Sequence, residues 1–295
     1  MAPTPAQSAL DDASLLARAC AYVDAQRSAG PADGDSGCLF EGHRGVVVRR
    51  LGMACLVVRV GPVLVVAVAD PRHAGEVLAN QAAVAASVGR TAAMAHGGAW
   101  FLGSLVRHQV AGLTQACLTA AAAAAAQGAG LPALAFTGCG LAGAVAELLA
   151  VDRTTAAAAA AAGLVGHPVG CVTFGAPPVW AAGPATRNYA PSVRRRRIVL
   201  AADPRPWLGG RRFAHLDEQP LWLTAAGEPV PQCSWTAAGI AAQVALRLLT
   251  RPAAQGAADP AYASAAYAAV LAKGCPSGSL GRGLATQGSS SSPNR

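Results

Sequence analysis

Lysine is almost absent from this sequence: Lys273 is the only one, and arginine supplies nearly all the positive charge behind a formal net charge of +8. Alanine, glycine and proline are abundant too, a bias typical of a GC-rich coding sequence, so the arginine count alone does not indicate nucleic-acid binding. The densest basic run, VRRRRIVL at 193–200, has no interleaved aromatic residue and continues into an apolar segment. We interpret it as the start of a strand and expect no nucleic acid among the partners.

Charged residues are missing from a long central stretch, residues 108–146. A run of this length without charge could indicate a transmembrane helix. It contains Pro132, several glutamines and several glycines, however, and its bulk is alanine, which gains little from lipid. We predict a buried helix, a turn and a core strand in this stretch, and no transmembrane segment.

Targeting and metal-binding patterns are missing as well. The N-terminal MAPTPAQSALDDASLL has neither a basic n-region nor an apolar h-region, so no secretory signal is predicted and we expect a cytoplasmic or otherwise intracellular protein. The eight cysteines include no Cys-x-x-Cys pair. In an intracellular chain this favours free buried thiols over disulfides or zinc. We predict no metal site and no cofactor.

The length of 295 residues and a hydrophobic content of 53% are enough for one sizeable core. We predict a single domain over 1–274 and a disordered, low-complexity tail over 275–295. Apolar runs alternate with helical patterns, which favours an α/β fold with a mainly parallel sheet and helices on both faces. Helices are expected at 11–26, 74–90, 100–126, 141–162 (with a break near Asp152), 234–249 and 260–272. Strands are expected at 45–50, 53–60, 62–70, 131–138, 167–179 and 194–206. We also expect a loop at 31–37 and an edge strand or hairpin at 218–229.

One strand-to-helix connection has the form of a catalytic turn. LPALAFTGCGLAGAVAELLA, at 131–150, begins as an apolar strand, turns on glycines and continues as an alanine-rich helix. In α/β-hydrolases the pattern G-x-S-x-G forms a strained turn of this kind and exposes its serine at the tip. Here Gly138 and Leu141 fit the pattern, but the serine position is Gly140 and the last glycine is Ala142.

Five segments in this order resemble the class 3, or fungal-type, lipase family of α/β-hydrolases, over about residues 14–248. FTGCGLAGAVAELLA is similar to the family's Thr-Gly-His-Ser-Leu-Gly-Gly-Ala-Leu-Ala turn. The other four are MAHGGAW (94–100), similar to Val-His-x-Gly-Phe; GCVTFGAPPVW (170–180), similar to Thr-Phe-Gly-x-Pro-x-Val; RIVLAADPRPWL (197–208), similar to Val-Asn-x-x-Asp-x-Val-Pro-x-Leu; and FAHLDEQPLWL (213–223), similar to Tyr/Phe-x-His-x-Gly-x-Glu-x-Trp. The resemblance implies an α/β-hydrolase-type fold.

The departures from the family fall on the catalytic residues. The resemblance implies a serine that attacks an ester carbonyl, a histidine that takes its proton and an aspartate that orients the histidine. Asp203 matches the acid, but Gly140 has no side chain to be acylated. The family's histidine comes shortly before the C-terminal helix, where this chain has Cys233 and Ser234, and no histidine follows His215. Gly140 and Asp203 are therefore interpreted as vestigial triad positions.

The oxyanion-binding position is altered too. The family has Phe-Arg-Gly-Thr/Ser at the end of the strand before the first crossover helix, and this chain has residues 68–71 there. Pro71 offers neither a hydroxyl nor a backbone N–H. The backbone N–H of Leu141 could still donate a hydrogen bond at this position.

Three functional hypotheses follow. The first is an inactive lipase-like protein that binds an apolar or lipid ligand, or a protein partner. The second is an active lipid or ester hydrolase with a non-standard nucleophile such as Cys139 or Ser234, or with a metal-free water route. The third is a globular structural or interaction domain without a ligand. We expect Cys139 to be a packed thiol, His96 and His215 to be structural, and Asp203 to accept hydrogen bonds within its own loop.

Overall fold

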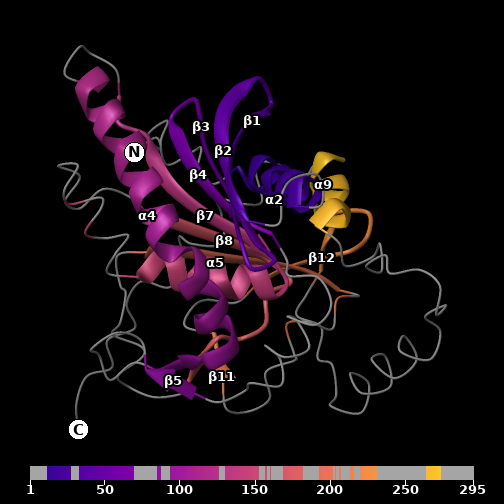
Figure 1. Ribbon diagram of the computed structural model, residues 1–295. Coiled ribbons are helices and arrows are strands. Elements are labelled where there is room, and N and C mark those ends of the chain that lie inside the picture. The colour runs from indigo at the N-terminus through magenta and orange to yellow at the C-terminus, as the bar shows by residue number, and fades with distance from the viewer. Residues whose placement is uncertain are drawn as a thin grey trace, which may run out of the picture.

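The computed structural model describes residues 12–27, 33–69, 85–87, 94–125, 130–152, 157, 160, 169–181, 193–201, 203, 206, 213–215, 220–230 and 264–273. Its centre is a nine-stranded sheet in the order β1-β2-β3-β4-β7-β8-β10-β12-β13 (Figure 1). The strands are β1 (Gly34–Phe40), β2 (His43–Arg50), β3 (Met53–Val60), β4 (Val63–Val68), β7 (Ala133–Cys139), β8 (Val169–Phe174), β10 (Val193–Leu200), β12 (Leu221–Leu223) and β13 (Pro229–Val230).

The first half of this sheet is an antiparallel meander. Strands β1 to β4 pair with their sequence neighbours, with Phe40 opposite His43 at the first turn. The two residues between them, Glu41 and Gly42, have φ angles of 49° and 80°, as a type I′ hairpin turn requires. The predicted loop at 31–37 was therefore wrong from residue 34 onward. Residues 34–37, which are typical of turns, belong to strand β1, and the chain reverses direction only after Phe40.

The second half of the sheet is parallel. Strands β4, β7, β8, β10 and β12 pair in parallel, and β13 closes a hairpin on β12 as predicted for the late edge of the sheet. All six residues of β4 are buried, which agrees with an almost wholly apolar strand covered on both faces. The sheet is thus parallel only from β4 to β12, because tight hairpin turns join the earlier strands.

Helices cover both faces of the sheet. On one face lie α2 (Ala13–Arg27) and α9 (Ser264–Ala272), which share a core with Leu56, Val65 and Ala135. On the other face α4 (Gly97–Ala125) and α5 (Leu141–Val151) share a core with Val57, Val66 and Phe136. The predicted arrangement of layers is confirmed (Figure 1).

A second, four-stranded sheet lies beside the first turns of α4 (Figure 1). Its order is β11-β9-β6-β5 and all its pairs are antiparallel. The predicted helix at 74–90 was wrong at 85–87, where the backbone pairs with β6 instead. The strands are β5 (Ala85–Ser87), β6 (Met94–His96), β9 (Trp180–Ala181) and β11 (Phe213–Ala214).

No helix in the described part of the chain is long and apolar enough to cross a membrane.

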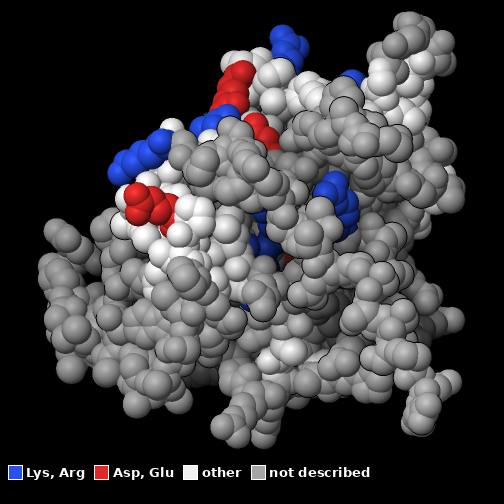
Figure 2. All heavy atoms as spheres, turned by 180° about the vertical axis from the view of Figure 1, so that it is seen from behind, with Lys and Arg blue, Asp and Glu red and all other residues white. Residues whose placement is uncertain are grey.

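Charges of both signs are mixed on the surface of the described residues. In the view of Figure 2, acidic and basic side chains of the described residues lie near one another instead of gathering by sign. Two ion pairs join such groups, Arg18 with Glu41 and Arg50 with Asp35.

Candidate functional site

The turn between β7 and α5 is tight, and the residue at its tip has a left-handed backbone. Gly140 occupies its tip, between Cys139 and Leu141, with φ 60° and ψ −132°. Its backbone N–H donates to the carbonyl of Phe174 (2.8 Å), and its own carbonyl accepts from the N–H of Gly143 (3.0 Å). Side chains rarely tolerate this left-handed φ, whereas glycine adopts it at no steric cost.

Two more glycines allow the turn to be this tight. A Cβ on Gly138 would lie 2.4 Å from the carbonyl oxygen of Ala142. A Cβ on Gly143 would lie 2.8 Å from the Cβ of Ala176 and 2.9 Å from the carbonyl oxygen of Gly138. Because backbone and Cβ atoms cannot swing aside as flexible side chains can, both positions require glycine.

Cys139 precedes the tip, and its side chain belongs to the core. The residue is 2% exposed and packs in the hydrophobic cluster that contains α2 and α9. Thr137, two residues earlier on the same strand, contacts the thiol of Cys20 of α2 (3.4 Å) from the same face. The expectation that Cys139 is a packed thiol agrees with this position.

Asp203 follows β10 and is fully buried. Its backbone N–H donates to the carbonyl of Leu200 (2.8 Å). Its carboxylate oxygen Oδ2 accepts a hydrogen bond from the hydroxyl of Tyr267 in α9 (2.6 Å), and the same hydroxyl accepts from the N–H of Leu200 (3.2 Å). The carboxylate lies so close to Gly175 that a Cβ there would come 2.0 Å from Oδ2. Asp203 therefore holds the end of β10 against α9.

Gly140 and Asp203 lie at the same end of the parallel strands, the carboxyl end. The strands that precede them, β7 and β10, both pair in parallel with β8, so their carboxyl ends meet. Two hydrogen bonds bridge the gap: the N–H of Gly140 donates to Phe174, and the N–H of Gly175 donates to Ile198 (2.9 Å). The structure brings the two sequence-predicted positions together, on either side of residues 174 and 175.

No protein-family model matches the chain, and no curated protein matches it. Solved structures do. Rhizomucor miehei lipase in complex with its propeptide superposes with a TM-score of 0.52 and 16% identity, over 76% of this chain and 70% of that one. A deletion mutant of the same complex gives 0.54 and 17%, over 76% and 69%. Lipase II from Rhizopus niveus gives 0.50 and 15%, over 74% and 80%.

This is a fungal-lipase fold of the α/β-hydrolase type. At such low identity the similarity establishes the architecture and leaves the chemistry to be argued from individual residues.

Within the fungal-lipase fold, His96 has a structural environment. It ends β6 directly before α4, is 7% exposed, and its Nδ1 accepts the N–H of Ala99 (3.4 Å) in the first turn of that helix. Its ring lies 4.9 Å from the ring of Phe213. Burial lowers its pKa. His96 therefore accepts a hydrogen bond from the first turn of α4 and packs against the small sheet. These contacts agree with the structural role expected from the sequence.

His215 directly follows β11. Both of its ring nitrogens are buried and have no hydrogen-bond partner of normal geometry among the described residues. Burial first, and the nearby charge of Arg197 second, lower its pKa to about 3. The ring is neutral near pH 7.

Two polar residues at this site were missed from the sequence. Tyr267 was assigned only to a helix, and nothing in the alanine-rich segment at 260–272, which also contains Tyr262, distinguishes it as a buried hydroxyl. Glu147 of α5 is 3% exposed, accepts the indole N–H of Trp180 (2.5 Å) and lies 3.5 Å from Nε of Arg195. It links α5 to the small sheet and to β10.

Of the remaining candidate positions, the structure describes Leu141 and leaves three undescribed. Leu141 is the first residue of α5 and is buried. Pro71, Cys233 and Ser234 lie outside the described residues, as does the predicted tail at 275–295. In the described part of the chain, no group of three or more histidine, cysteine, aspartate or glutamate side chains could hold a metal ion.

Proposed function

We propose that this protein is a catalytically inactive lipase homologue that binds an apolar or lipid ligand, or else a protein partner, and does not hydrolyse esters. The observation that carries the proposal is Gly140 at the tip of the turn between β7 and α5. Covalent ester hydrolysis on this fold begins with a side-chain oxygen at the tip, and glycine has none.

The surroundings of Asp203 support the same interpretation. A triad aspartate hydrogen-bonds the Nδ1–H of its histidine, whereas Oδ2 of Asp203 accepts from Tyr267. On this proposal Gly140 and Asp203 are vestigial triad positions, and Asp203 persists because it holds α9 against the sheet. Pro71 and Leu141 are the corresponding oxyanion positions, of which only Leu141 retains a backbone donor.

The alternative function is an active lipid or ester hydrolase with a different nucleophile. The burial of Cys139 in the α2 and α9 core argues against that thiol, because an attacking thiolate must reach a substrate and be stabilised as an anion. Ser234 remains the other candidate. A domain without any ligand is the third possibility, and ligand titration separates it from the first.

The decisive experiment measures hydrolysis of short-chain and long-chain nitrophenyl esters by the purified protein. We expect no turnover above the solution background, since the residual rate of a site without its nucleophile comes only from binding and oxyanion contacts. Gly140→Ser alone should also be inactive, because it has no histidine to take its proton. Activity should require serine at 140, histidine near Cys233 or Ser234, and threonine at 71 together.

Controls distinguish the alternatives. Robust turnover by the unchanged protein that is lost in Cys139→Ala, or in Ser234→Ala, would overturn the proposal and identify the nucleophile. Saturable binding of a fluorescent fatty-acid analogue, without its consumption, supports an apolar ligand. If no such binding occurs, the protein-partner and ligand-free hypotheses remain.

A further inference from the structure

Strand β1 forms one edge of the nine-stranded sheet, and no described strand lies beyond it. Its two-residue turn makes Phe40 and His43 a hydrogen-bonded pair, after which hydrogen-bonded and non-hydrogen-bonded pairs alternate along β1. Ser36 and Cys38 therefore use their backbone groups on β2. The N–H and C=O groups of Asp35 and Gly37 and the C=O group of Leu39 point outward, where another strand could accept and donate. The N–H of Leu39 faces the hydroxyl of Tyr22 in α2.

The side chains on this edge are unusual for an exposed strand. Asp35, Gly37 and Leu39 share one face, and Leu39 is 63% exposed. A Cβ on Gly37 would meet no atom within 4 Å, so the space above this glycine is empty. It lies on the same face as Leu39, two residues further along the strand. Natural edge strands usually carry lysine, proline or a bulge that prevents pairing, and β1 has none of these in its central residues.

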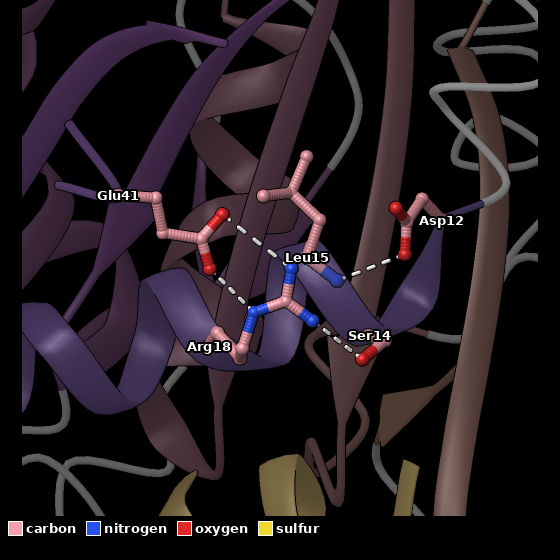
Figure 3. A network of polar contacts seen from close by, with 5 residues as sticks. All are labelled: Asp12, Ser14, Leu15, Arg18 and Glu41. Atoms are coloured by element: carbon pink, nitrogen blue, oxygen red, sulfur yellow. Dashed lines mark hydrogen bonds and ion pairs between the residues drawn. The ribbon is translucent and has the colours of Figure 1, made fainter. Parts of the chain in front are cut away.

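The acidic groups at the two ends of β1 are already paired within the chain. Arg50 lies 3.0 Å from Asp35. At the other end Arg18 of α2 contacts Glu41 (2.5 Å) and donates to Ser14 (2.7 Å), an arrangement visible in Figure 3. Since each carboxylate has its own guanidinium, two copies of this edge would not meet as two unpaired negative charges.

We propose that β1 pairs antiparallel with β1 of a second copy of this chain, so that the sheet continues across a two-fold dimer. The register that fits places Leu39 opposite the partner's Gly37, and Gly37 opposite the partner's Leu39. Each exposed leucine then covers the bare glycine of the other copy. Both pairs use the outward backbone groups, and in the dimer the N–H of Leu39 exchanges the Tyr22 hydroxyl for the partner's backbone carbonyl. At the axis Cys38 lies opposite the partner's Cys38 in a non-hydrogen-bonded pair, where Cα atoms are about 4.5 Å apart.

The spacing at the axis makes the register testable, because a disulfide spans Cα separations of about 4.4–6.8 Å. The protein is incubated with a copper–phenanthroline oxidant, which takes two electrons from two thiols while two protons are released. We expect a covalent dimer on non-reducing gels for the wild type and for Cys117→Ser, and none for Cys38→Ser. Light scattering should give the dimer mass for all three before oxidation.

Gly37→Pro tests the pairing itself. Proline removes an N–H that points away from β2, so no hydrogen bond within the monomer is lost, whereas the dimer loses a donor. We expect a monomer with a thermal midpoint close to that of the wild type. Leu39→Lys, an exposed change, should also give a monomer and serves as the second variant if Gly37→Pro does not fold.

Three outcomes would overturn the proposal. They are a wild-type chain that is monomeric at its highest soluble concentration, a dimer that persists in both Gly37→Pro and Leu39→Lys, and a dimer in which Cys38 does not cross-link.

Discussion

At the scale of single residues, the Tyr267 hydroxyl forms the most informative contact. It donates to Asp203 and accepts from the N–H of Leu200, so one oxygen serves two buried groups at once. Taking a hydrogen-bond donor away from a buried carboxylate is destabilising. Part of the stability of this edge of the sheet therefore depends on one hydroxyl from the far end of the sequence.

Tyr267→Phe removes that hydroxyl and keeps the ring that packs 5.5 Å from Phe174. We expect the free energy of unfolding to fall by about 1–3 kcal/mol, since Asp203 and Leu200 each lose a hydrogen bond. Urea denaturation measures the change. The matched control is Tyr22→Phe, a half-buried tyrosine whose ring packs 5.3 Å from the ring of Phe40; it should cost less than about 1 kcal/mol. Equal losses for the two variants would show that Asp203 does not depend on Tyr267.

At the scale of elements, the turn between β7 and α5 could be predicted from the sequence because glycines at 138, 140 and 143 leave few alternatives. The hairpins of β1 to β3 were harder: Gly34 and Gly37 look like turn residues, while the turns themselves use Glu41 and Leu51 at positive φ. The small sheet was not predicted at all. Its strands are two or three residues long, and two of its three pairings, β6 with β9 and β9 with β11, join segments far apart in the sequence, so no local periodicity reveals them.

The strain at the turn predicts a difference between two glycines. Gly140→Ala forces a Cβ into φ 60° and ψ −132° and should destabilise the protein by about 1–3 kcal/mol. Gly112 lies in α4, where a Cβ meets nothing within 4 Å, and Gly112→Ala should stabilise it by about 0.5–1 kcal/mol. Thermal or urea unfolding of the two variants checks the sign. A stabilising Gly140→Ala would mean that the turn relaxes without its left-handed residue.

At the scale of the whole molecule, the layers of the fold were predictable, because long apolar strands and helices determine them. The partners of the buried polar groups were not. The sequence does not reveal which residues contact Asp203 and Glu147. The fold brings Tyr267 to Asp203, and it brings Trp180 and Arg195 to Glu147. Such contacts join residues up to 64 positions apart in sequence, beyond the reach of any local pattern.

Two histidines with lowered pKa values, His96 and His215, predict how stability depends on pH. The pKa of His215 is lowered to about 3 in the folded protein, and its ordinary value is about 6.5. Between these values the unfolded chain binds the proton and the folded chain does not, so stability is fully present above about 6.5 and is lost as the pH falls towards 3. His96, whose pKa is lowered by burial, acts in the same direction.

We expect the urea midpoint to fall markedly between about pH 7 and about pH 4.5. His215→Gln should flatten this dependence, whereas His43→Gln, at an exposed position of β2, should leave it unchanged. If all three proteins follow the same pH curve, the pKa of His215 is not lowered in the folded protein.

The contact between α9 and the rest of the fold has a consequence for biosynthesis. Ser264 donates to Asp24 of α2 across 240 residues of sequence, and Tyr267 reaches Asp203 from the same helix. A ribosome releases the chain from its N-terminal end, so α2 and β10 emerge well before the helix that completes them. Until residue 267 has left the exit tunnel, Asp203 has not met its tyrosine donor, so this end of the sheet is completed only after α9 has emerged.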